Sequence, residues 1–274
     1  METSVNKELT VNIPIQILAG IGRLVLALLT ELGRIGLFFF TTFSRIIHLP
    51  HSIVRIAQQI HFIGTKSLFI VSLTGLFTGM VLGVQLYYTL SRLGSETALG
   101  VAVALSLIRE LGPVLTALMI TGRAGSSIAA EIGIMRISEQ IDALDTMDID
   151  PIKFLVVPRL LAALLCFPLL TAIFDVIGIV GGYLTGVVML GVNSGTYLNR
   201  MEQSVVWADV SGGFIKSFAF AIIVSVICCY QGYTMHLRRN GFGARGVSVA
   251  TTSAVVISSV LILATDYVLT SFLL

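Results

Sequence analysis

Long apolar stretches alternate with shorter polar segments along this chain. The apolar stretches cover residues 67–88, 99–121, 154–190, 213–235 and 247–272. A helix needs about 20 mostly apolar residues to cross the hydrocarbon core of a membrane, and each stretch meets that length. The pattern therefore predicts an all-α integral membrane protein with five transmembrane helices.

The third stretch is longer than one crossing requires. At 1.5 Å per residue, a helix over 154–190 would extend nearly twice the ~30 Å hydrocarbon core. Pro158, Pro168 and Asp175 interrupt it. Both one long kinked helix that extends beyond the bilayer and a crossing followed by a re-entrant piece fit this pattern.

The N-terminal region, residues 1–60, differs from the five stretches. Arg23, Arg34 and Arg45 are eleven residues apart, about three helical turns, so they share one face of a helix over 13–47. The opposite face is apolar. We expect a short polar tail and then an amphipathic helix in the plane of the membrane. A true crossing with buried arginines is the alternative.

Composition excludes several classes of protein. The chain is 55% hydrophobic and only 12% charged, with a mean hydropathy of +0.95, which excludes an ordinary soluble enzyme and a disordered chain. The net charge of +2 is too small for nucleic-acid binding. The four histidines and three cysteines form no metal-ligand pattern, so we expect no metal. No phosphate-binding loop for ATP is visible, so any work that requires energy must draw on another chain or an ion gradient.

Loop charges predict the orientation. The segments 122–153 and 236–246 each carry three Lys or Arg residues, whereas the alternate loops hold only Arg92 and Arg200. The positive-inside rule places the N-terminus and both basic segments in the cytoplasm and the C-terminus outside. Binding of anionic lipid is the alternative explanation for the basic loop 236–246.

Arg109 and Glu110 are charged residues near the middle of the second stretch. Neighbours on a helix point about 100° apart, so each needs its own partner or water. Pro113 lacks the amide that would bond to the carbonyl of Arg109 and kinks the helix there. We expect the two charges to mark a cavity or pathway; a structural ion pair with a distant charge, such as Asp175, is the alternative.

The polar segment 122–153 lies between the second and third stretches. Ile137, Ile141 and Leu144 can share one helix face, with acidic residues elsewhere. This predicts an amphipathic cytoplasmic helix, either docked in a groove of a partner protein or lying on the rest of the chain.

Glycines recur every four residues in the first stretch, at Gly75, Gly79 and Gly83. They share a face, which lets another helix approach closely. We interpret this stripe as intramembrane packing.

Several long segments resemble the MlaE/YrbE permeases, the membrane subunits of ABC transporters that work with MCE-domain proteins. The segments include TGMVLGVQLYYTL, RELGPV, GRAGSSIAAEIGIM and GARGVSVATTSAVV. The resemblance covers residues 60–274 and implies a permease domain over 61–274, with an in-plane N-terminal helix, five crossings and a coupling helix between crossings two and three.

The resemblance also implies an assembly. Two copies of the chain would pair in the bacterial inner membrane, above two cytoplasmic ABC ATPases that bind ATP and Mg²⁺. A hexameric periplasmic MCE protein and, in some systems, a small STAS-domain subunit would complete it. The substrate would be a phospholipid or related lipid, and its transport supports the asymmetry of the outer membrane.

Residue roles follow from the same resemblance. A lipid cavity near the first two crossings would involve Leu82, Leu90, Arg109, Glu110 and Leu111. The residues that would contact the ATPase or hold the coupling helix in place are Glu131, Arg136, Glu139 and Gln140. Gly75, Gly79, Gly83 and Pro113 would serve helix packing. Asp175 and Arg92 receive no family role.

Three other functions compete with this interpretation. A proton-driven transporter would use Arg109, Glu110, Asp175 and Asp266 as a relay, but no inverted repeat is apparent. A membrane enzyme would need a nucleophile or a metal site, and the sequence displays neither. A structural scaffold would not need a central charged pair.

Overall fold

The computed structural model describes residues 22–23, 25–26, 29–46, 53–237 and 243–273. Within these ranges the chain is helical and contains no strand. Five helical segments there are long and apolar enough to cross a membrane: Ile53–Arg92, Glu96–Ile137, Ile152–Met189, Trp207–Tyr233 and Gly243–Leu273. The expectation of an all-α protein with five crossings is confirmed for this part of the chain.

The first two segments are divided by wide π-helical turns. The first consists of α2 (Ile53–Ile60), η1 (His61–Thr65) and α3 (Lys66–Arg92). The second consists of η2 (Glu96–Ala98), α4 (Leu99–Ser106), η3 (Leu107–Leu111), α5 (Gly112–Ile120), η4 (Thr121–Gly125) and α6 (Ser126–Ile137). The short helix α7 (Gln140–Thr146) follows.

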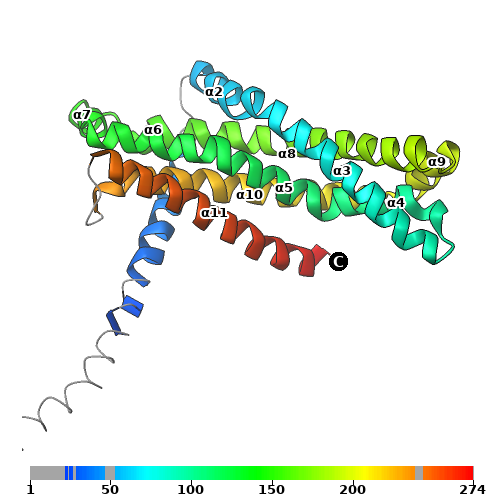
Figure 1. Ribbon diagram of the computed structural model, residues 1–274. Helices are drawn as coiled ribbons and strands as arrows, with labels where there is room; N and C mark the ends of the chain where they lie inside the picture. Colours follow the sequence, from blue (N-terminus) through cyan, green and yellow to red (C-terminus); the bar gives the residue numbers. More distant parts are fainter. Residues whose placement is uncertain (1–21, 24, 27–28, 47–52, 238–242, 274) are drawn as a thin grey trace, which may run out of the picture.

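The remaining elements complete the bundle. The third segment consists of η5 (Ile152–Val156), α8 (Val157–Tyr183) and η6 (Leu184–Met189). After it come α9 (Ser194–Ser204), α10 (Trp207–Tyr233), η7 (Met235–Leu237) and α11 (Gly243–Leu273). Figure 1 shows the crossing helices side by side, with α7 at one end of the bundle and α9 at the other.

Two polar segments differ from the form expected of them. The first part of 122–153, expected to hold a separate amphipathic helix, instead continues the second crossing through 126–137 as α6, and the expected loop 191–212 contains α9 and the first turns of α10. Polar residues continue an apolar helix where tertiary contacts support it, and hydropathy alone does not locate such ends. The third segment is one continuous helical run over 152–189, so the single long helix is correct and the re-entrant piece is not.

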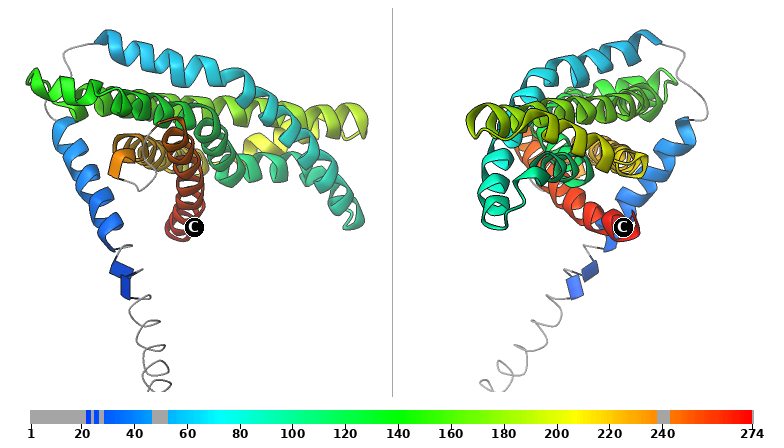
Figure 2. Two further views of the ribbon diagram at one scale, coloured as in Figure 1. Left: turned by 60° about the vertical axis from the view of Figure 1, so that its left-hand side comes forward. Right: turned by 90° about the vertical axis from the view of Figure 1, so that its right-hand side faces the viewer.

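The N-terminal helix over 29–46 packs on the bundle through a few contacts. Arg45 Nε lies 2.9 Å from Asp150 Oδ2, and the hydroxyl of Tyr230 donates to Glu31 Oε1 at 3.1 Å. Figure 2 shows this helix leaving the bundle at a steep angle to the crossing helices. Its place in the plane of the membrane stays a prediction, and residues 13–21 of the expected helix lie outside the described part.

Among the described helices, α3 and α8 form the most extensive contact. Gly75, Gly79 and Gly83 face α8, and a Cβ atom on Gly79 would overlap the carbonyl of Gly178. A Cβ on Gly75 would lie 2.9 Å from the carbonyl oxygen of Phe174. The two backbones approach closely because Gly79 on α3 faces Gly178 on α8 and neither residue carries a side chain.

This contact predicts the effect of one added methyl group. Gly79→Ala should destabilise the protein by about 1–3 kcal/mol, because the helices must separate to admit the Cβ. Gly122→Ala, where the added atom meets open space, is the control and should be neutral or mildly stabilising. Thermal unfolding of both variants in one detergent measures the difference; equal melting temperatures would contradict the packing account.

Candidate functional site

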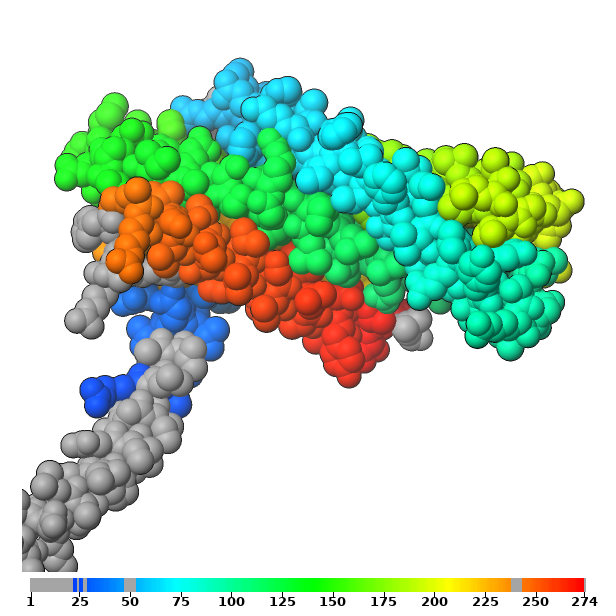
Figure 3. Space-filling model, viewed as in Figure 1, coloured from blue at the N-terminus to red at the C-terminus, as the bar shows by residue number. Residues whose placement is uncertain are grey.

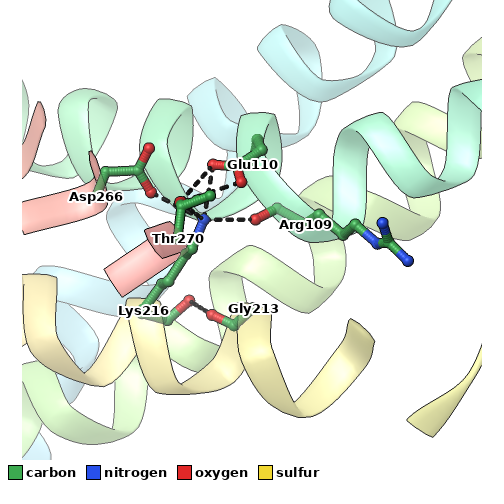
Figure 4. A network of polar contacts seen from close by, with 7 residues as sticks. Arg109, Glu110, Gly213, Lys216, Asp266 and Thr270 are labelled. Carbon is green, nitrogen blue, oxygen red and sulfur yellow. Dashed lines mark hydrogen bonds and ion pairs between the residues drawn. The ribbon is translucent and has the colours of Figure 1, made fainter. Parts of the chain in front are cut away.

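Lys216 on α10 is the centre of a polar network between three crossings. Its side chain is 3% exposed. The Nζ atom donates to Glu110 Oε2 at 2.6 Å, to Thr270 Oγ1 at 2.7 Å and to the Arg109 carbonyl at 2.9 Å. It also lies 3.1 Å from Asp266 Oδ1. Figure 4 shows these groups converging from the second, fourth and fifth crossings.

The contact with the Arg109 carbonyl has a local cause. Pro113, at the start of α5, has no amide hydrogen to donate to the carbonyl four residues earlier, which belongs to Arg109. The chain forms the π-helical turn η3 just before this proline. Lys216 supplies the missing donor, so the kink and the buried cation stabilise each other.

Arg109 pairs with a different residue. Its Nε lies 2.7 Å from Asp209 Oδ1, and the Asp209 side chain is 8% exposed. Asp209 also accepts the backbone amide of Val206 and thereby caps the start of α10. The structure therefore bears out a separate partner for each charge of the Arg109–Glu110 pair.

These contacts are structural ion pairs with distant charges, which was the alternative to a cavity, but the partner named for it, Asp175, is wrong. Its Oδ1 atom lies against Gly112, where a Cβ would overlap it, and has no hydrogen-bond partner in the described part of the chain. Sequence reasoning missed Lys216 and Asp209 as the actual partners. Lys216 is a charge inside the predicted fourth crossing, just as Asp266 is inside the fifth, and that shared property was the available signal.

The network borders a small hollow. The hollow has a volume of about 50 Å³ and is lined by Arg109, Glu110, Asp209, Lys216 and Thr270, among others. This space admits a few water molecules, each of which needs roughly 10–15 Å³ by this measure, but not a lipid. The expected cavity residues Leu82, Leu90 and Leu111 do not line it; they are half-buried and pack at the edge of the core.

Removal of the central cation predicts a large loss of stability. Lys216→Met leaves the carboxylates of Glu110 and Asp266 without their cation and should cost about 3–5 kcal/mol. Lys153→Met is a matched control, since Lys153 lies in η5 outside the network. Thermal unfolding in detergent compares the two. A Lys216→Met protein as stable as the control would contradict a structural role for Lys216.

The residues expected to couple to an ATPase lie at the opposite end of the bundle, near α7. Two of them, Glu131 and Arg136, form ion pairs with other residues of the same chain. Glu131 Oε2 lies 2.8 Å from Arg159 Nη2, and the Arg159 side chain is 4% exposed. Arg136 Nη1 lies 2.7 Å from Asp142 Oδ1. The first contact joins α6 to α8, and the second joins α6 to α7.

The other two residues are exposed. Glu139, at the turn between α6 and α7, has a φ of 57°, and Gln140 begins α7. This turn separates Ile137, which is 36% exposed, from Ile141, which is fully buried. The expected common face of Ile137, Ile141 and Leu144 is therefore wrong. α7 lies on the rest of the chain through Ile141 and presents Glu139 and Gln140 to the solvent.

His236 lies beside Arg136, outside the crossing helices. Arg136 Nε donates to His236 Nδ1 at 3.0 Å. The pKa of His236 is lowered below its ordinary value of 6.5, mainly because the imidazole is partly buried and also because the Arg136 guanidinium lies beside it. The neutral imidazole accepts the bond, and its protonation places two cations side by side.

This contact predicts a pH dependence. A lowered histidine pKa favours the folded state above the ordinary value, and the benefit is lost as the pH falls through 6.5 towards the lowered pKa. The protection factors of α7 amides, which correct for the pH dependence of intrinsic exchange, should therefore fall more between pH 7.5 and 5.5 in the wild type than in His236→Gln. An equal fall in both proteins would show that His236 does not contribute.

Comparison with known proteins identifies the family. A sequence model of Permease MlaE matches residues 56–272. The chain belongs to the MlaE permease family. It is 46% identical over 250 residues to a probable ABC transporter permease protein of Rickettsia bellii, covering 91% of this chain and 95% of that protein.

Two further relatives extend the comparison of this MlaE-family chain. The intermembrane phospholipid transport system permease protein MlaE of Haemophilus influenzae is 40% identical over 260 residues, covering 94% of this chain and 98% of that protein. The chloroplastic protein TRIGALACTOSYLDIACYLGLYCEROL 1 of Arabidopsis thaliana is 38% identical over 215 residues, covering 78% and 60%. The chain is thus a multi-pass membrane protein related to transport permeases.

Proposed function

We propose that this MlaE-family chain is the permease subunit of an ABC transporter that moves phospholipid, or a related lipid, between the inner membrane and a periplasmic MCE-protein assembly. The observation that carries the proposal is the 40% identity, over nearly the whole chain, to a Haemophilus permease named for intermembrane phospholipid transport. The chain performs no covalent chemistry. A separate ATPase binds ATP and Mg²⁺ and supplies the energy.

The proposed assembly contains two copies of the chain. The hollow beside Arg109 admits water but no lipid, so a lipid cavity at Arg109 needs additional space, either between two copies of the chain or after the helices move apart. Two cytoplasmic ATPases, a hexameric MCE protein and, in some systems, a STAS-domain subunit are the further partners. The N-terminus faces the cytoplasm and the C-terminus the periplasm.

The polar end of this cavity falls on Arg109 and Glu110. The Arg109 side chain is 41% exposed despite its bond to Asp209, which leaves guanidinium hydrogens for a lipid phosphate. Glu110 is 39% exposed and positions the head group, while Leu82, Leu90 and Leu111 contact the acyl chains.

Coupling to the ATPase falls on α7. Glu139 and Gln140 are exposed and contact the ATPase, whereas Glu131 and Arg136 hold the coupling region through their ion pairs with Arg159 and Asp142. When ATP closes the ATPase pair, a push on α7 passes to α6 and α8 through these ion pairs. This movement changes the cavity at the other end of the bundle.

The proposal predicts two separable defects. Co-expression with a neighbouring ATPase and MCE protein, followed by purification, should give a complex that hydrolyses ATP and retains phospholipid. Reversal of the charge at Glu139 together with Gln140→Lys should lower ATPase association at least several-fold, since both residues are exposed on α7. Arg109→Ala should keep the ATPase but reduce the retained lipid.

Glu202→Lys is the control for the coupling variant, because Glu202 is exposed on α9 at the other end of the bundle. It should leave ATPase binding and lipid retention unchanged. If no ATPase co-purifies and lipid exchange instead follows a proton gradient, the ABC assignment is wrong and proton coupling replaces it.

A further inference from the structure

A second hollow lies between α2–α3 and α6, at the α7 end of the bundle. Its volume is about 570 Å³, far larger than the hollow beside Lys216. α2 and α6 diverge towards this end in Figure 1, and their blue-to-cyan and green surfaces are both visible in Figure 3. None of the residues proposed for the lipid cavity lines this second hollow.

One wall of this hollow is cationic. Lys66 lines it from the start of α3, with Nζ 5.5 Å from the centre of the Phe62 ring, and forms no ion pair with a described residue. His61 lines the same wall. The uncharged first crossing begins directly after Lys66, so its ammonium group lies at the boundary where lipid phosphates are found.

The opposite wall is anionic. Glu131 lines the hollow from α6, and its side chain is 52% exposed even though one oxygen contacts Arg159. A simple phosphate or a purely anionic lipid head group would meet repulsion from this carboxylate. A head group with a phosphate and an ammonium group matches both walls, because each charge faces its opposite.

The Glu131 carboxylate distinguishes between zwitterionic head groups. Arg159 contacts its Oε2 atom, and the side chain is 52% exposed, so a primary ammonium in the hollow can donate a charge-assisted hydrogen bond to this carboxylate. A trimethylated ammonium has no hydrogen to donate.

We propose that this hollow binds the phosphoethanolamine head group of a membrane lipid, with the phosphate at Lys66 and the primary ammonium at Glu131. The inference rests on the proposed lipid transport for its choice of ligand, and it places a zwitterionic lipid at the end of the bundle remote from Arg109. Phosphatidylethanolamine is therefore preferred over phosphatidylcholine and phosphatidylglycerol at this position.

The test uses the full chain in nanodiscs, without an ATPase. Ser127 lines the hollow and is exposed, and the three native cysteines are buried, so Ser127→Cys supplies a local thiol for maleimide labelling. We expect labelling about five-fold slower in phosphatidylethanolamine than in phosphatidylcholine discs, equal to roughly 1 kcal/mol of preference. Ser138→Cys, exposed outside the hollow, should label equally in both.

Further variants test the partner of the phosphate. In the Ser127→Cys background, Lys66→Gln should abolish the protection and Lys153→Gln should preserve it. Soluble glycerophosphoethanolamine added to phosphatidylcholine discs distinguishes a site for the head group alone, which protects, from one that requires the anchored lipid, which does not; both support the site.

Two results would overturn the inference. One is equal labelling of Ser127→Cys in the two kinds of disc. The other is equal protection in Lys66→Gln and Lys153→Gln, which would assign any lipid effect to the bilayer rather than to this hollow. Because this assay contains no ATPase, neither result bears on the proposed ABC function, which the co-purification experiment tests.

Discussion

A single buried ammonium group joins the parts of this bundle. Lys216 bonds to groups from the second, fourth and fifth crossings, and one of these is the carbonyl that Pro113 leaves without a donor. The hydrocarbon core of a membrane supplies no substitute for a missing partner, so the charges in the network depend on one another and on the water that the small hollow admits. The kink, the charged pair at 109–110 and the packing of α10 therefore depend on one another.

The glycine contact and the ion pairs give the molecule two kinds of rigidity. α3 and α8 are fixed by backbone contact at Gly79 and Gly178, which tolerates no added atom. The end near α7 is instead held by ion pairs whose acidic partners are exposed, such as Arg136–Asp142. Pairs open to solvent contribute little stability and rearrange readily, which suits the coupling proposed for this region while the centre of the bundle keeps its shape.

Apolar length predicted the five crossings well, because membrane solvation acts on each segment separately. The unusual residues Arg109, Glu110 and Pro113 also identified the polar site. Their partners were not predictable, because Asp209 and Lys216 lie about 100 residues away and only the packing of helices brings them near. The break at Glu139, which directs Ile137 away from Ile141, was also not predicted. Helical periodicity assumes an uninterrupted helix. The hollow at Lys66 depends on the divergence of α2 from α6 and has no counterpart in sequence spacing.

An experimental structure of the chain, purified with a co-expressed ATPase in lipid, tests the central claim most directly. The account predicts two copies of the chain, with α7 against the ATPase, lipid density beside Arg109, and Lys216 Nζ still bonded to Glu110 and to the Arg109 carbonyl. A single chain without an ATPase, or Lys216 directed into the bilayer away from these groups, would contradict it.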